Sequence, residues 1–152
     1  MIDFKKEALE IKDEVVANRR YLHRNAEGGF DLPLTTDFVL KKLEEIGLKG
    51  EKCGKAGIVV TIGRGDKCVL LRGDMDALPM KETSGVPFAS ETGFTHSCGH
   101  DCHASMLLGA AKILKAHEKE LGGKVKFMFQ PAEELLQGAL DMIDRGLLEN
   151  PH

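Results

Sequence analysis

Apolar residues recur at three- and four-residue steps in four stretches of the chain, and each stretch predicts an amphipathic helix. These helices are expected over residues 3–24, 35–46, 104–121 and 135–145. Asp3 is suited to cap the first helix, and Thr35 or Thr36 the second. We expect Arg19 and Arg20, near the end of the first helix, to lie on its solvated face.

Between the helices the pattern changes to short β-branched and apolar runs. Residues 58–62 and 68–72 flank the turn 63–66, which predicts a β-hairpin whose apolar strands are buried on both faces. Residues 124–129 predict a further strand, whereas residues 81–94 predict a long irregular loop of the kind that often carries function. Strands that alternate with helices in this way predict an α/β fold.

Composition places the chain among single-domain proteins. Its 152 residues are 42% hydrophobic, which is enough for one core, so we expect one domain over residues 1–152. The net charge of −3 without basic runs argues against a nucleic-acid partner. No apolar run reaches the roughly 18 residues that span a bilayer, and the N-terminus does not resemble a signal peptide, so we expect a cytoplasmic protein with no membrane partner.

The stretch from His96 to His103 is the densest group of candidate metal ligands, because five of its eight residues are histidine or cysteine. Cys98 and His100 flank Gly99, so both side chains can turn toward one ion, with zinc, manganese, cobalt and nickel as candidates. Asp101 is expected to cap the helix that follows, whose dipole would lower the pKa of the thiol. The spacing is not that of a zinc finger.

Acidic residues follow two of the predicted strands. Glu133 and Glu134 are adjacent and point in different directions, so one can bind a metal while the other handles protons. The alternative is that both lie exposed at the start of a helix. Asp74 and Asp76 are expected on opposite faces, so that at most one serves the site by hydrogen-bonding a ligand histidine.

Four segments of the chain together resemble a known family. They are Arg20-Tyr21-Leu22-His23, Arg72-Gly73-Asp74-Met75-Asp76-Ala77-Leu78-Pro79, His96-Ser97-Cys98-Gly99-His100-Asp101-Cys102-His103 and Phe129-Gln130-Pro131-Ala132-Glu133-Glu134. In this order they resemble the N-acyl-amino-acid amidohydrolases, which include hippurate hydrolases and plant auxin-conjugate hydrolases. The resemblance implies the N-terminal part of a metallopeptidase-type catalytic domain, with three α/β/α layers around a mixed sheet.

The resemblance also implies a site with two divalent metal ions, manganese, zinc, cobalt or nickel. By motif position Cys98, His100 and Glu134 match metal ligands. Glu133 matches the general base and Asp76 an acid that orients the site. The implied reaction is hydrolysis of the amide bond of an N-acyl amino acid or a similar peptide-like substrate, in which Glu133 takes a proton from water and passes it to the leaving amine.

Several features depart from the family pattern. Leu135-Leu136-Gln137 replaces a usually glycine-rich segment after the paired glutamates. Family members are also longer, with a lid and dimerisation domain and two further ligand histidines, so a full-length form would form a homodimer and the 152-residue chain alone is expected to be inactive. Two alternatives remain: a short non-catalytic module that binds a metal or a partner, and a redox switch that uses Cys98 and Cys102.

Overall fold

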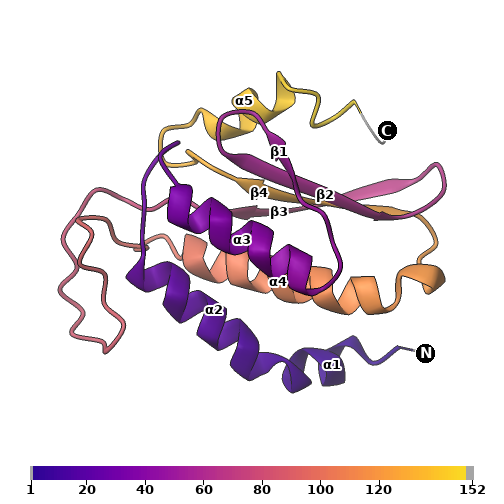
Figure 1. The fold of residues 1–152 in the computed structure, drawn as a ribbon, viewed down its shortest axis with the longest axis horizontal. Helices are drawn as coiled ribbons and strands as arrows, with labels where there is room; N and C mark the ends of the chain where they lie inside the picture. Colours follow the sequence, from indigo (N-terminus) through magenta and orange to yellow (C-terminus); the bar gives the residue numbers. More distant parts are fainter. Residues whose placement is uncertain (1, 150–152) are drawn as a thin grey trace.

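The computed structural model describes residues 2–149, which form a four-stranded sheet with helices packed around it (Figure 1). In chain order the elements are α1 (Phe4–Glu10), α2 (Lys12–Arg24), α3 (Pro33–Glu45), β1 (Glu51–Cys53), β2 (Gly57–Gly63), β3 (Cys68–Asp74), α4 (His100–Ala116), a 3-10 turn (Glu118–Glu120), β4 (Lys124–Gln130) and α5 (Gly138–Ile143). Within the described part of the chain, no helix is long and apolar enough to cross a membrane.

The sheet is mixed, with the strand order β1-β2-β4-β3. β4 lies between β2 and β3, antiparallel to β2 and parallel to β3. The predicted hairpin of residues 58–62 and 68–72 is therefore wrong, because a strand more than fifty residues later in the chain separates its two arms. The hairpin that does form joins β1 to β2, with Cys53 opposite Gly57.

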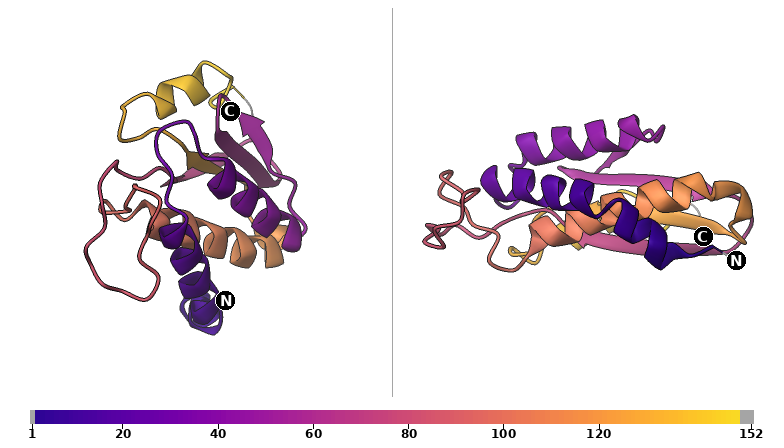
Figure 2. Two further views of the ribbon diagram at one scale, coloured as in Figure 1. Left: turned by 60° about the vertical axis from the view of Figure 1, so that its left-hand side comes forward. Right: turned by 90° about the horizontal axis from the view of Figure 1, so that it is seen from below.

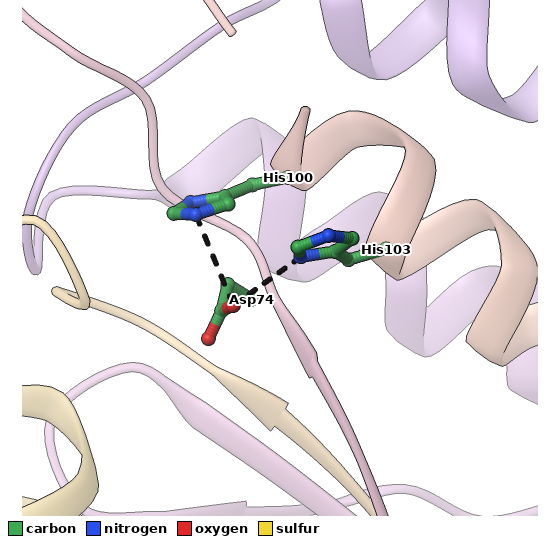
Figure 3. A group of neighbouring side chains, drawn as sticks. All are labelled: Asp74, His100 and His103. Atoms are coloured by element: carbon green, nitrogen blue, oxygen red, sulfur yellow. Dashed lines mark hydrogen bonds and ion pairs between the residues drawn. The ribbon is translucent and has the colours of Figure 1, made fainter. Parts of the chain in front are cut away.

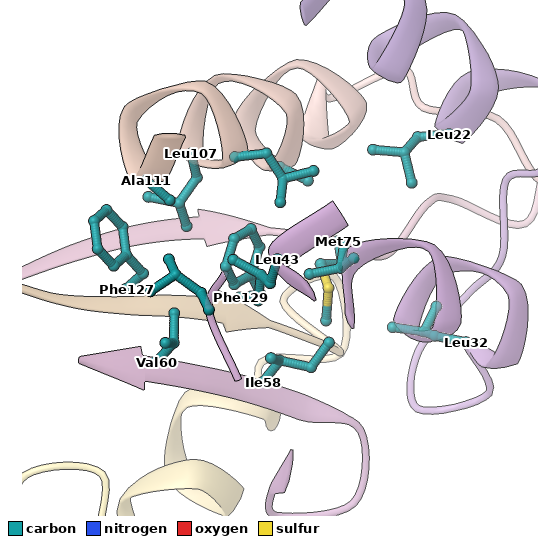
Figure 4. Packing of buried hydrophobic residues seen from close by; sticks show 14 of the residues in the cluster. Leu22, Leu32, Leu43, Ile58, Val60, Met75, Leu107, Ala111, Phe127 and Phe129 are labelled. Atoms are coloured by element: carbon teal, nitrogen blue, oxygen red, sulfur yellow. The ribbon is translucent and has the colours of Figure 1, made fainter. Parts of the chain in front are cut away.

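Helices cover both faces of the sheet, which confirms the predicted α/β class and its three layers. α3 and α4 lie on one face and α5 on the other, while α2 packs against the outer side of α4 (Figure 2). Successive side chains of β4 point to opposite faces of the sheet and pack into the helix layers on both sides. Phe127 and Phe129 belong to the large core beneath the helices (Figure 4), and Met128 packs with Cys53 and Met142 on the α5 side.

β3 is an edge strand of the described sheet, and its middle is exposed. Val69 retains 59% and Leu70 39% of their accessible surface. The expectation that this apolar strand is buried on both faces is therefore wrong for β3. In the described sheet β3 pairs with β4 on one side only. Apolar periodicity does not distinguish such an edge strand from a central one.

Two of the predicted helices begin or end at other residues than expected. Residues 3–24 form two helices that break at Ile11, although Asp3 caps the first as expected by accepting from the backbone N–H of Lys6. The second predicted helix begins at Pro33 rather than near Thr35. The carboxylate of Glu27, on the preceding loop, accepts its exposed N–H groups instead of a threonine hydroxyl.

The last predicted helix, over 135–145, is shortened to α5 (Gly138–Ile143). A turn precedes it, in which the N–H of Leu136 donates to the carbonyl of Glu133. Ala132 and Leu136 both have positive φ, 49° and 56°, which are conformations that L-residues rarely adopt. A glycine is needed at position 138, the first residue of α5, because a Cβ there would lie 1.6 Å from the carbonyl oxygen of Pro131.

The parallel pairing of β3 with β4 places the candidate site. Asp74 lies opposite Gln130 at the last pair of the ladder. The segments that follow these two strands therefore leave the sheet side by side, and they carry Asp76 and the Glu133–Glu134 pair. Loops at the carboxyl ends of neighbouring parallel strands are a common position for binding sites.

Candidate metal centre

Asp76 holds the parts of the candidate site together. Its side chain is fully buried, and its two carboxylate oxygens accept hydrogen bonds from the backbone N–H groups of Glu133 at 3.0 Å and Glu134 at 3.1 Å. Its backbone carbonyl accepts a third hydrogen bond, at 2.7 Å, from Nδ1 of His100. One residue therefore sets the position of two carboxylates on one loop and of an imidazole on the first turn of α4.

The other nitrogen of the His100 ring faces only carboxylates. Because Nδ1 donates to a carbonyl, Nε2 points away from it, 3.7 Å from Oε2 of Glu133, 3.8 Å from Oδ2 of Asp74 and 4.0 Å from Oε1 of Glu134. Burial alone would lower the pKa of His100, but the hydrogen bonds to Asp76 and the charges of Asp74 and Asp76 outweigh it and raise that pKa to about 9. This position favours a positive charge, whether a proton or a metal ion.

The donor set fits a divalent metal. His100, Glu133 and Glu134 each offer a ligand atom, and these atoms lie within 4.8 Å of one another. Oε1 of Glu134 is buried and has no hydrogen-bond partner in the described part of the chain, which is costly for a carboxylate unless a cation compensates it. An imidazole nitrogen with carboxylate oxygens suits manganese, zinc, cobalt and nickel.

Cys98, the other predicted ligand, is exposed and is in neither described group of possible ligands, so its metal ligation stays a prediction. The pKa of the thiol is raised, first by its hydrogen bond to Glu134 and then by burial and by neighbouring carboxylates that include Glu133. The expected lowering of this pKa by the helix dipole is therefore wrong, because the neighbouring carboxylates disfavour a negative charge on the sulfur. A bound cation would reverse that balance.

Asp74, His100 and His103 form a second group of possible ligands (Figure 3). Oδ2 of Asp74 lies 3.3 Å from Nδ1 of His103, and Oδ1 lies 2.5 Å from the Arg72 guanidinium. A cation and an N–H donor thus already compensate Asp74, which accounts for this group without a metal. The expectation that Asp74 and Asp76 lie on opposite faces is wrong, because residues two apart on a strand share a face, and both carboxylates approach the His100 ring, at 3.8 Å and 3.6 Å. That at most one of them serves the site stays a prediction.

Asp101 does not cap α4, contrary to expectation. The N-cap position is occupied by Gly99, at φ +81°, and no side chain caps this helix. Asp101 is 1% exposed and lies 2.6 Å from Nε of Arg19 and 2.8 Å from Nδ1 of His23. Arg19 is therefore an ion-pair partner of a buried carboxylate rather than part of a purely solvated face.

Sequence reasoning missed the polar network around His23. Its Nε2 lies 2.9 Å from Oε1 of Glu82, at the start of the loop 81–94, which is irregular as predicted. His23 ends one of the four quoted motifs, and this was the only signal available for it. Two other candidates stay outside both ligand groups: His96 is buried with its pKa lowered by that burial to about 4, and Cys102 is half-buried.

Comparison with known proteins decides the family. Residues 70–152, which contain both halves of the centre, match the model of peptidase family M20/M25/M40. The chain belongs to this family. Among its M20 relatives, it is 42% identical to hippurate hydrolase of Campylobacter jejuni over 147 residues, 38% identical to N-acyl-L-amino acid amidohydrolase of Geobacillus stearothermophilus over 145, and 44% identical to IAA-amino acid hydrolase ILR1-like 4 of Arabidopsis thaliana over 141.

These alignments cover 94%, 92% and 91% of this chain, but only 38%, 39% and 32% of the respective relatives. Solved M20 structures agree with the fold. A Bacillus subtilis protein described as a dinuclear metal-binding peptidase from the M20 family superposes with a TM-score of 0.86 at 35% identity, over 90% of this chain and 40% of that one. An aminobenzoyl-glutamate utilization protein from Klebsiella pneumoniae, at 22% identity and a TM-score of 0.77 over 98% and 44% of the two chains, supports the fold alone.

Proposed function

We propose that this chain carries the N-terminal part of the active site of a metal-dependent amidohydrolase that cleaves N-acyl amino acids or related small amides. The observation that supports this most directly is the position of Nε2 of His100, which faces the carboxylates of Glu133 and Glu134. Asp76 forms hydrogen bonds to all three residues and so holds them together. Relatives named hippurate hydrolase and N-acyl-L-amino acid amidohydrolase indicate the substrate class.

Each residue has a distinct role in this proposal. Cys98, His100 and Glu134 hold metal ions, and manganese, zinc, cobalt or nickel would provide the polarisation of an amide carbonyl that uncharged residues cannot. Glu133 accepts a proton from the attacking water and returns it to the leaving amine. Asp76 is a positioning residue, because its carboxylate binds the backbone of the two glutamates rather than the reacting atoms.

The proposed site is only partly contained in this chain. A dinuclear centre is named for the Bacillus subtilis relative, and two ions need more ligands than three side chains provide. Since the chain spans 32–39% of the length of the relatives compared above, we propose that it forms one segment of a catalytic domain. The remaining ligands and a lid and dimerisation domain would lie outside it, in a cytoplasmic enzyme that forms homodimers at full length.

The test is a hydrolysis panel with metal analysis. The chain is assayed alone and fused to the remaining two thirds of the Geobacillus relative, on N-benzoylglycine and N-acetyl amino acids, with each of the four metals. We expect Glu133→Gln to retain metal and lose turnover, and Glu134→Gln to lose metal. Turnover by Glu133→Gln equal to that of the parent would exclude Glu133 as the base, and metal binding without hydrolysis by the folded fusion would favour a non-catalytic module.

A further inference from the structure

A cluster of buried polar side chains lies next to the metal centre, and its member Asp101 directly follows the candidate ligand His100. At its centre His23, on the last turn of α2, has a side chain that is 7% exposed. Its Nδ1 lies 2.8 Å from Asp101, and its Nε2 lies 2.9 Å from Glu82. Carboxylate oxygens accept but do not donate. The ring of His23 therefore bridges two buried carboxylates, and Nη2 of Arg19 also lies 3.4 Å from its Nδ1.

The two carboxylates belong to different elements that frame the site. Asp101 follows the candidate ligand His100 directly and is 1% exposed at its side chain, and Glu82 is 3% exposed at its side chain. Burial alone would raise the pKa of Glu82, but hydrogen bonds from His23, Ser84 and the backbone of Ser90 outweigh it and lower that pKa to about 2. His23 thus joins α2, the loop 81–94 and the start of α4.

The start of α4 depends on this external support. Its N-cap is Gly99 in a left-handed conformation, and no side chain binds its exposed N–H groups from the cap position. Instead Asp101 accepts from the N–H of Cys102 within the first turn and is fixed by His23 and Arg19 on its other side. A glycine at a helix start lets the backbone of the first turn adopt many orientations. The contacts of Asp101 with His23 and Arg19 therefore restrict the orientation of the preceding residue, His100.

The loop 81–94 is held by the same histidine. The N–H of Ser90 donates to Oε2 of Glu82, which closes the loop around that carboxylate. Phe88 packs edge-on against the His23 ring, with ring centroids 5.4 Å apart. Cζ of Arg19 lies 5.0 Å from the centroid of the Phe88 ring. The two ends of the loop meet where Leu78 pairs with Thr95, a few residues from Asp76 and His100.

From these contacts we propose that His23 is a positioning residue for the metal centre: by bridging Asp101 and Glu82, it fixes the first turn of α4 and thereby aims His100 at the metal. The inference rests on the metal ligation in the proposed function. Residues that orient metal ligands through intermediates of this kind typically alter metal affinity 10- to 100-fold when they are replaced.

The test is Co²⁺ binding to the whole chain, followed by the visible absorption spectrum of the bound ion and by titration for Kd. We expect His23→Gln to weaken Co²⁺ binding about tenfold or more and to shift the spectrum, because Gln cannot donate to both carboxylates. The control is the same substitution at His117, at the opposite end of α4, where the ring pairs with Glu7 and Glu120 on the surface. His117→Gln should leave Kd and spectrum unchanged.

Thermal unfolding separates positioning from stability. His23→Gln removes the ring that bridges the buried carboxylates of Asp101 and Glu82, whereas the combination with Glu82→Gln also removes one of these two carboxylates. We expect the double variant to recover the melting temperature of the parent but not its Co²⁺ affinity. If the single variant does not fold, the Co²⁺ affinity of the double variant tests the positioning role. A lower melting temperature with unchanged Kd and spectrum in either variant would overturn the positioning role. Failure of both the unaltered chain and its fusion to the rest of the Geobacillus relative to bind Co²⁺ would instead refute the metal centre.

Discussion

Replacing Asp76 by Asn tests whether its carboxylate organises the site. The substitution keeps the shape of a fully buried side chain but leaves only one oxygen for the N–H groups of Glu133 and Glu134. One charge-assisted hydrogen bond is lost, and one N–H then faces an NH₂ group. Hydrogen bonds to charged groups contribute roughly 1.5–3 kcal/mol, and a buried unsatisfied donor costs about 1–3 kcal/mol.

We therefore expect Asp76→Asn to lower the free energy of unfolding by about 3 kcal/mol, which for a chain of this length corresponds to about 6–12 °C in melting temperature. Urea unfolding followed by circular dichroism measures the first quantity, and a thermal melt measures the second. Co²⁺ affinity should fall as well, since the carboxylate that is lost binds the backbone of Glu134 and lies 3.6 Å from Nδ1 of His100.

The matched control is Asp66→Asn, which makes the same chemical change at an exposed turn between β2 and β3. It should alter stability by no more than about 0.5 kcal/mol. If Asp76→Asn were as stable as this control and bound Co²⁺ equally well, the hydrogen bonds to the two glutamates would not organise the site, and the assigned role of Asp76 would be wrong.

Three further predictions concern local energetics. The pKa of Glu82 in the folded chain, about 2, lies below its ordinary value of 4.5, so Glu82→Gln should be less stable than the parent above about pH 4.5. Urea unfolding should show this difference in stability vanishing as the pH falls toward 2, and a difference that does not change with pH would contradict the ion-pair account. Gly138→Ala should lower the free energy of unfolding by about 3 kcal/mol, because its Cβ would lie 1.6 Å from the Pro131 carbonyl oxygen, while Gly122→Ala, with open space around it, should be close to neutral. Leu136→Asn should raise the melting temperature, corresponding to about 1 kcal/mol, because asparagine tolerates the φ of +56° that this 88% exposed leucine adopts; an unchanged melt would show that the turn is not strained.

Local patterns located most helices and strands but not their partners. Apolar periodicity identified the helical character of α2, α3 and α4 and the strands β2, β3 and β4, because it depends on which residues a short element can bury. It failed for the β2–β3 connection, since a short turn between two strands looks the same whether they pair with each other or with a third strand. Capping was missed at α3 for a similar reason, because its carboxylate comes from Glu27, outside the helix.

For the candidate site, the sequence by itself singled out Cys98, His100, Glu133 and Glu134 as candidates, because histidine, cysteine and paired carboxylates are chemically conspicuous wherever they fold. The structure brings three of them together, His100, Glu133 and Glu134. Only the tertiary structure decided how they meet. The parallel pairing of β3 with β4 brings Asp76 beneath residues that follow it by nearly sixty positions. Single histidines such as His23 carry no local signal, because their role depends on carboxylates distant in sequence that only the folded chain brings within hydrogen-bonding distance.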